Sequence, residues 1–164
     1  MEKEFMDMII DSRRLIFKVC NLYAFEKEFI DDLYQEIVLQ LWRSFPSFRG
    51  ESKPSTWVYR VALNTAIGEF RREVRKPRKT SISDLHLELP DNETMLDDRL
   101  KLLHEAMRRL SPIDRALLML YLEEKSYQEI GLILGISVSN VGVKLNRLKT
   151  KLEEVIKSKE YESR

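Results

Sequence analysis

Uncharged polar residues followed by cations, near the C-terminus, have the types and spacing that suit contact with duplex DNA. Residues 138–152 read VSNVGVKLNRLKTKL, with apolar residues at intervals of three and four. Such a helix packs one face inward and turns the other to solvent. A major groove admits one helix, whose first turns reach base edges while later cations reach phosphates. The expected base contacts are Ser139, Asn140, Val143 and Lys144, and the expected phosphate contacts are Arg147, Lys149 and Lys151.

A short helix is expected directly before this one. Ser126 and Glu129 form a capping box, in which a hydroxyl and a carboxylate satisfy free amides at a helix start. Gly135 suits the positive φ that ends a helix, and Ser137 suits the cap of the next. The order is that of a helix-turn-helix. An ordinary helical hairpin is the alternative, but Gly131, Gly135 and Ser137 are costly in one.

A second constellation, between Phe48 and Arg72, interleaves aromatic rings with a polar loop and cations. Bases stack on rings for about 1 to 3 kcal/mol each while cations follow the backbone of a single strand. The mixture favours unstacked nucleic acid, and the loop 49–53 could hold a single base. For Trp57 alone, packing in a helical core is the favoured interpretation. The candidate residues are Arg49, Ser52, Lys53, Trp57, Tyr59, Arg60, Asn64 and Arg71.

The elements that position these residues are predicted to be helices. The chain of 164 residues has five glycines and five prolines, 34% of it is charged, and apolar residues recur at helical spacing. The prediction is an all-α fold of two small helical domains joined by a flexible linker, with the helix-turn-helix in the C-terminal domain. Helices are expected at about 5–24, 27–44, 55–76, 94–110 and 113–122, before the helix-turn-helix. The packed stripe of the first is expected to be Met6, Ile9, Ile10, Phe17, Cys20 and Ala24.

The linker is placed at 77–92, between domains at 1–76 and 93–164. It lies between Pro77 and Pro90, loses periodicity and is rich in Ser and Asp. An edge strand at 85–89 is the alternative, less favoured because nothing else in the chain could pair with it. Basic residues cluster on either side of the linker, which suggests two contacts with one long polyanion.

Several classes of function are disfavoured by composition. The single Cys20 cannot form an internal disulfide, and His86 and His104 lack metal-ligand spacing. Neither a phosphate-binding glycine loop nor a nucleophile beside a base is recognisable. We therefore expect no catalytic residue, no metal, no cofactor and no enzymatic activity. No run of about 20 apolar residues is present and the first ten residues are acidic, so no membrane insertion and a cytoplasmic location are expected.

Four segments in this order resemble the extracytoplasmic-function sigma factors, which are bacterial initiation subunits of RNA polymerase. They are DDLYQEIVLQLW (31–42), FRGESKPSTWVYRVALN (48–64), LSPIDRALLMLYLEEKSYQEIGLILGIS (110–137) and VGVKLNRLKTKL (141–152). The resemblance covers about residues 5–156. The chain departs from the family pattern V-K-S-R-L-x-R-A-R at Gly142 and Val143, so phosphate contact there is expected to be weaker.

The resemblance implies core RNA polymerase and promoter DNA as partners, with an anti-sigma factor as a further one. The loop and the helix after it would recognise and melt the −10 element through the candidates named above, and the helix-turn-helix would read the −35 element. A stand-alone helix-turn-helix regulator is the alternative function, but it would need neither a polymerase-binding face nor a melting helix. The implied contacts with the largest polymerase subunit are Asp32, Leu33, Gln35 and Glu36.

Overall fold

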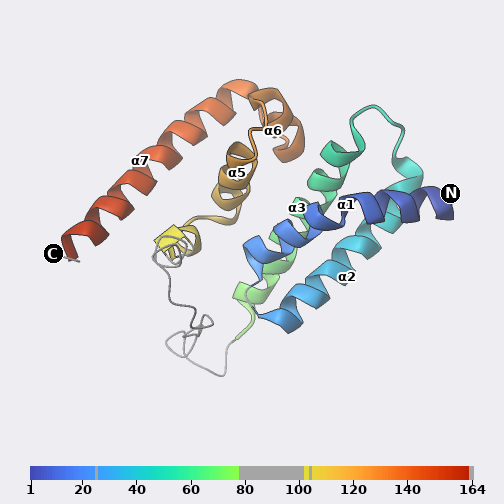
Figure 1. The fold of residues 1–164 in the computed structure, drawn as a ribbon, viewed down its shortest axis with the longest axis horizontal. Helices are drawn as coiled ribbons and strands as arrows, with labels where there is room; N and C mark the ends of the chain where they lie inside the picture. Colours follow the sequence, from blue (N-terminus) through green and yellow to red (C-terminus); the bar gives the residue numbers. More distant parts are fainter. Residues whose placement is uncertain (25, 78–101, 104, 163–164) are drawn as a thin grey trace. The chain divides into compact units, whose positions relative to one another are not determined.

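Helices account for the architecture of the chain. The computed structural model describes residues 1–24, 26–77, 102–103 and 105–162. Within those ranges the regular elements are all helical, which confirms the predicted class (Figure 1). The helices group into two compact units, the first containing α1 to α3 and the second containing α5 and α7.

The first unit is a bundle of three helices that contact one another pairwise. These are α1 (Glu2–Tyr23), α2 (Lys27–Ser44) and α3 (Pro54–Arg75), and a 3-10 turn, η1 (Phe45–Ser47), follows α2 (Figure 1). The observed bounds agree with the predicted helices to within three residues at each end. Fully buried side chains from every helix fill the centre of the bundle, namely Ile16, Val19, Cys20, Ile37, Leu41, Val58 and Leu63.

The packed face of α1 differs from the prediction. Ile9, Cys20 and Ala24 are buried as expected, but Met6, Ile10 and Phe17 are exposed by 51%, 58% and 41%. The buried face is completed instead by Phe5, Ser12, Ile16, Val19, Leu22 and Tyr23. The stripe was wrongly placed because α1 carries apolar residues around more than one face, so helical spacing alone allows more than one choice of buried side.

The later part of the chain forms α5 (Pro112–Leu122), α6 (Tyr127–Leu134) and α7 (Val138–Glu162) (Figure 1). Ser111 caps α5 by accepting a hydrogen bond from the Asp114 amide at 3.2 Å, and Pro112 is the first helical residue, as predicted. Of the helix expected at 94–110, residues 102–103 and 105–108 are described and helical. The predicted linker beyond Pro77, the alternative strand at 85–89, His86 and His104 lie outside the described residues.

The caps of the helix-turn-helix agree with the sequence prediction. The Ser126 amide donates to Glu129 Oε2 at 3.0 Å and the Glu129 amide donates to Ser126 Oγ at 3.1 Å, which completes the capping box. Gly135 has a φ of +70° and ends α6. The Asn140 amide donates to Ser137 Oγ at 3.1 Å at the start of α7. These local bonds fix where each helix begins and ends.

Packing in the second unit joins α7 to the elements before it. Val141, Leu145 and Leu148 of α7 are buried as predicted, whereas Val138 is 48% exposed. Arg115 of α5 is 4% exposed, and its guanidinium donates to the Arg108 carbonyl at 3.0 Å. An ion pair between Lys159 and Glu105 joins the far end of α7 to the helical residues 105–108. The long helix α7 is thus held near its start by buried apolar residues and near its end by an ion pair.

Candidate nucleic-acid interface

The first part of α7 presents uncharged side chains to solvent. Residues 138–143 carry no charge, and the cations of the helix all follow them. Ser139, Asn140 and Val143 are exposed, Val143 by 46%. Ser137 fixes the helix start because its hydroxyl accepts a hydrogen bond from the backbone amide of Asn140, so these side chains project from a defined position in the first two turns. Together they present a hydroxyl, a side-chain amide and an apolar side chain to solvent.

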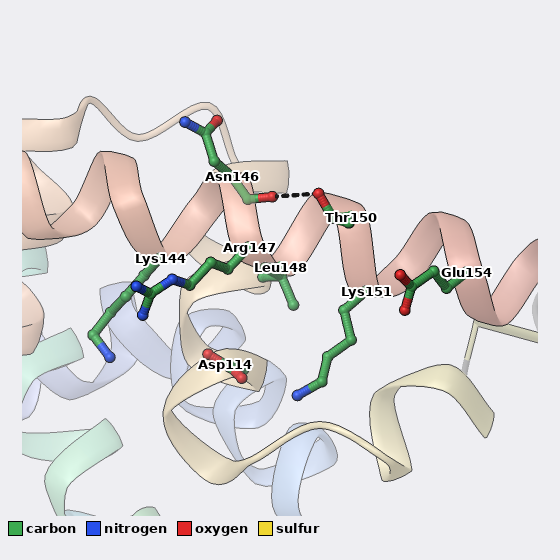
Figure 2. Close-up of a pocket in the computed structure, with 8 residues that line it drawn as sticks. All are labelled: Asp114, Lys144, Asn146, Arg147, Leu148, Thr150, Lys151 and Glu154. Atoms are coloured by element: carbon green, nitrogen blue, oxygen red, sulfur yellow. Dashed lines mark hydrogen bonds between the residues drawn. The ribbon is translucent and has the colours of Figure 1, made fainter.

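A groove of about 630 Å³ lies beside the cationic part of α7 (Figure 2). Lys144, Arg147 and Lys151 supply its cations, and Asp114 and Glu154 its carboxylates, so its net charge is positive. Figure 2 shows the side chains of Lys144 and Arg147 extending to the same side, with Asp114 of α5 below α7 in this view, between Lys144 and Lys151. Three of the predicted DNA contacts are therefore gathered in one place. The remaining lining residues are Asn146, Leu148 and Thr150.

Lys149 lies apart from these cations. Its Nζ is 4.6 Å from the centre of the Tyr121 ring, near the end of α5. A hydrogen bond to Tyr121 raises the pKa of Lys149, and the charge interactions with Tyr121 and Tyr127 act in the same direction. A cation over an aromatic face is attracted to the ring. Lys149 thus has a partner within the protein, and no signal in the sequence points to Tyr121 as that partner.

On the first unit, part of the predicted −10 set shares one face of α3. Arg60, Asn64 and Arg71 are exposed, and spacings of four and seven residues bring them to the same side of the helix. Tyr59 differs, because it is only 4% exposed and its ring belongs to the core of the bundle. Its burial argues against direct contact with a base. The exposed face of α3 is therefore cationic and polar, without Tyr59.

The loop before α3 is held at both ends. The Phe48 amide donates to the Phe45 carbonyl at 3.0 Å, and Pro54 begins the helix. Gly50 takes a φ of +71°, a conformation that other residues rarely adopt. Arg49 and Lys53 are exposed and Ser52 is half-buried. The loop therefore offers two cations and a hydroxyl from a backbone bend that requires glycine.

An aromatic cluster supports this loop. Trp57, in the first turn of α3, is half-buried against Phe48 at 4.9 Å and Phe45 at 6.4 Å between ring centres. Phe5 of α1 continues the cluster, at 5.3 Å from Phe45 and 4.9 Å from Trp42. The pair of Phe48 and Trp57 is tilted and the other three pairs are edge-to-face. Aromatic pairs at these separations stabilise beyond simple burial. The rings from three helices and the loop act as one support, which sequence spacing alone did not reveal.

The predicted polymerase-binding residues lie on α2. Asp32 and Gln35 are exposed, while Glu36 is half-buried and accepts a hydrogen bond from Gln40 Nε2 at 2.8 Å. Leu33 is only 8% exposed and packs in the core, which argues against direct contact by its side chain. The three polar residues remain a group on one helix.

Tyr34 lies on the side of α2 that contacts α1, two residues from both Asp32 and Glu36 and so away from them around the helix. Its ring stacks on Phe17 at 4.6 Å with 26° between the planes. Burial raises the pKa of Tyr34, and Cys20 raises it further, whereas Arg13 lowers it. The pair forms a partly exposed aromatic contact between α1 and α2. Sequence reasoning did not single out either ring for this position.

Comparison with known proteins assigns the family. Sequence models of sigma-70 region 2 and of sigma-70 region 4 match residues 8–76 and 100–152. The chain is similar to the ECF RNA polymerase sigma-E factor of Haemophilus influenzae, with 29% identity over 140 residues, 77% of this chain and 74% of that protein. It is 31% identical over 134 residues to the RNA polymerase sigma factor HrpL of Pseudomonas syringae pv. syringae, 77% of this chain and 73% of that protein. The chain belongs to the extracytoplasmic-function sigma factors.

The fold of this sigma factor is also found in a solved structure. The sigma factor RpoE of Bartonella quintana, crystallised in complex with the anti-sigma factor NepR, matches with a TM-score of 0.72 and 19% identity. The match covers 94% of this chain and 98% of that one. As a member of its family, the chain is an alternative sigma factor for promoter recognition by RNA polymerase.

Three further features of this sigma factor concern metal sites, membrane helices and its single thiol. Among the residues that the structure describes, no group of three or more His, Cys, Asp or Glu side chains could hold a metal ion. Within the same ranges, no helix combines the length and apolarity that a membrane crossing needs. Cys20 is fully buried, and burial raises the pKa of its thiol to about 12. A thiol in that state is a poor nucleophile.

Proposed function

We propose that the two units divide promoter recognition between them. The first unit, with residues 1–76, binds core polymerase and opens the −10 element, and the second, with residues 93–164, reads the −35 element. The observation that carries this proposal is the order of side chains along α7. Exposed, uncharged residues come first, and the cations that line the groove beside the helix follow. Base edges are read by the first turns of such a helix, and phosphates by the cations that follow.

At the −35 element, Ser139, Asn140 and Val143 contact bases. Lys144 was expected among the base contacts, but it lines the same groove as Arg147 and Lys151. We therefore assign all three cations to phosphates along the groove beside α7. Lys149 contributes less, because its ammonium already lies over Tyr121. Removing any one of the phosphate-binding cations should reduce the salt dependence of binding, since fewer counterions are then released.

At the −10 element, the loop 49–53 receives an unstacked base. The exposed cationic face of α3 then follows the backbone through Arg60, Asn64 and Arg71. Trp57 supports the loop through Phe48 and offers the remaining exposed part of its ring for stacking. Opening a duplex at a melted site costs a few kcal/mol per unstacked base, which stacking and backbone contacts offset.

Core polymerase binds the α2 face through Asp32, Gln35 and Glu36. Support comes from the exposure of the first two and from the hydrogen bond that orients the Glu36 carboxylate. Leu33 shapes this face from beneath as a buried residue. An anti-sigma factor is a further partner, by analogy with the RpoE protein that was solved with NepR.

The protein acts in the cytoplasm, where RNA polymerase works, and has no catalytic activity of its own. A stand-alone helix-turn-helix regulator is the alternative, and it would bind DNA without core polymerase. Run-off transcription separates the two. Core polymerase from the same bacterium should give discrete transcripts from genomic fragments only when this chain is added. A failure to give promoter-dependent transcripts with any fragment, while the chain still binds DNA, would support the regulator instead.

A further inference from the structure

We propose that the exposed residues between Val138 and Val143, at the start of α7, read A·T base pairs within the −35 element. Val143 contacts the methyl group of a thymine, and Asn140 bonds an adenine. This inference rests on the proposed function, in which α7 enters the major groove at that element. It adds the chemical identity of the bases, which the function alone leaves open.

Val143 points away from the protein interior. It lies two residues from both Val141 and Leu145, which are buried, and two residues are a rotation of about 200° around an α-helix. Its 46% exposure agrees with that direction. The buried side of α7 packs against α5, so the opposite side is free to enter a major groove of DNA. Val143 lies near the centre of that opposite side.

The exposed chemistry of these turns excludes the commonest contact with guanine. Guanine is read by Arg or Lys through O6 and N7, and residues 138–143 contain neither. Lys144, the first cation, lines the groove beside α7 together with Arg147 and Lys151, and the proposed function assigns it to a phosphate rather than to a base. An amide suits the N6 and N7 atoms of adenine, and an apolar side chain suits the thymine methyl. Asn140 and Val143 offer these two groups and leave A·T pairs as the matching partners.

The spacing of the two residues fits neighbouring base pairs. Asn140 and Val143 are three residues apart, so their Cβ atoms are about 5–6 Å apart on the helix surface. Base pairs in a duplex follow each other at about 3.4 Å. The two side chains therefore reach base pairs that are adjacent or one step further apart. The backbone amide of Asn140 donates a hydrogen bond to the Ser137 hydroxyl, which holds the first turn in place and leaves the side chain of Asn140 for this contact.

The test uses holoenzyme assembled from the full chain and core polymerase of its own bacterium. It first selects promoter fragments from a pool randomised across the −35 element. Each thymine of the selected element is then replaced by deoxyuridine, which lacks only the methyl group, and each adenine by 7-deazaadenine, which lacks N7. Binding of each fragment is measured by competition. One deoxyuridine should weaken binding about fourfold, the value for one buried methyl group.

Variants assign each effect to its residue. Val143→Ala should abolish the sensitivity to that deoxyuridine, and Asn140→Ala the sensitivity to one 7-deazaadenine. Val138→Ala is the matched control, since Val138 is 48% exposed on the same helix but about 140° around it from Val143. This control should retain both sensitivities.

The outcomes separate the inference from the function beneath it. The inference is overturned if holoenzyme selects a −35 element but no deoxyuridine weakens binding, or if Val143→Ala keeps the sensitivity. A holoenzyme that selects no −35 sequence overturns the proposed role of α7, and the base assignment with it.

Discussion

Trp57 and Phe48 lie with their ring centres 4.9 Å apart and their planes at 38°, joining the first turn of α3 to the loop before it. The contact continues through Phe45 to rings of α1 and α2. Trp57 therefore fixes the position of the loop 49–53 relative to the exposed face of α3. A loop that must hold one unstacked base gains affinity when its shape exists before binding.

Replacing Trp57 by Ala should loosen this loop and destabilise the first unit. Loss of a half-buried indole should lower the free energy of unfolding by about 2 kcal/mol, less than for a fully buried one. Circular dichroism during urea unfolding measures that change. Fluorescence of 2-aminopurine placed in the −10 element measures the rate of promoter opening. The substitution should lower this rate by a larger factor than it lowers the affinity for the −35 element.

Trp57→Phe is the control for the aromatic support. A phenyl ring keeps contact with Phe48, so stability and opening should fall less than in the Ala variant. Equal opening rates in the wild type and the Ala variant would contradict a supporting role for Trp57.

Gly142→Ala should stabilise the second unit by about 1 kcal/mol, the usual difference between Ala and Gly within a helix. A Cβ at this position would lie 3.6 Å from Cε2 of Tyr127, an ordinary contact that needs no rearrangement. Thermal unfolding measures the gain. Gly135→Ala is the matched control and should destabilise, because Gly135 has a φ of +70°. A loss of stability in Gly142→Ala would show that α7 cannot accept a side chain there.

Local sequence signals predicted the helix ends well. The capping box at Ser126 and Glu129, the cap at Ser137 and the positive φ of Gly135 are all observed. Each depends on residues within four positions of one another, so the sequence contains the whole interaction. The fold class followed from the same kind of signal, since helical spacing is also local.

Contacts between distant segments could not be predicted in this way. Lys149 was expected at a phosphate, yet its partner Tyr121 is 28 positions earlier and on another helix. Burial of Tyr59 and exposure of Phe17 likewise depend on which side of each helix the bundle covers. Apolar residues occur on several sides of α1 and α3, and only packing selects among them.

Lys151 and Lys149 should differ in their contribution to DNA binding. Lys151→Ala removes a cation from the groove beside α7, so the slope of log K against log salt should decrease by about 1. Lys149→Ala should change the slope less, because the ammonium of Lys149 lies over Tyr121. Titration of −35 DNA with holoenzyme at several salt concentrations measures both slopes. Equal decreases for the two variants would place Lys149 at a phosphate, as the sequence first indicated.

The buried thiol of Cys20 should make the stability of the first unit depend on pH in the alkaline range. A pKa raised from 9.0 to about 12 in the folded state means that the neutral thiol is favoured by folding. Its contribution is therefore complete below pH 9.0 and decreases as the pH rises toward 12. The difference in unfolding free energy between the wild type and Cys20→Ala, measured by urea unfolding, should shrink over that range. A constant difference would show that the folded thiol titrates normally.

Charge reversal on α2 should separate polymerase binding from DNA recognition. Glu36→Lys breaks the hydrogen bond from Gln40 and places a cation on the face that we assign to core polymerase. Binding to core polymerase should weaken by at least tenfold, while binding of the chain alone to −35 DNA should stay unchanged. Asp7→Lys makes the same charge change on α1 and is the matched control, because Asp7 is exposed and lies two residues from both buried Phe5 and Ile9, on the side of α1 away from the core. It should have little effect on polymerase binding. Fluorescence anisotropy with labelled chain measures polymerase affinity, and a gel-shift titration measures DNA affinity. If Glu36→Lys and Asp7→Lys weaken polymerase binding equally, net charge rather than this face governs assembly.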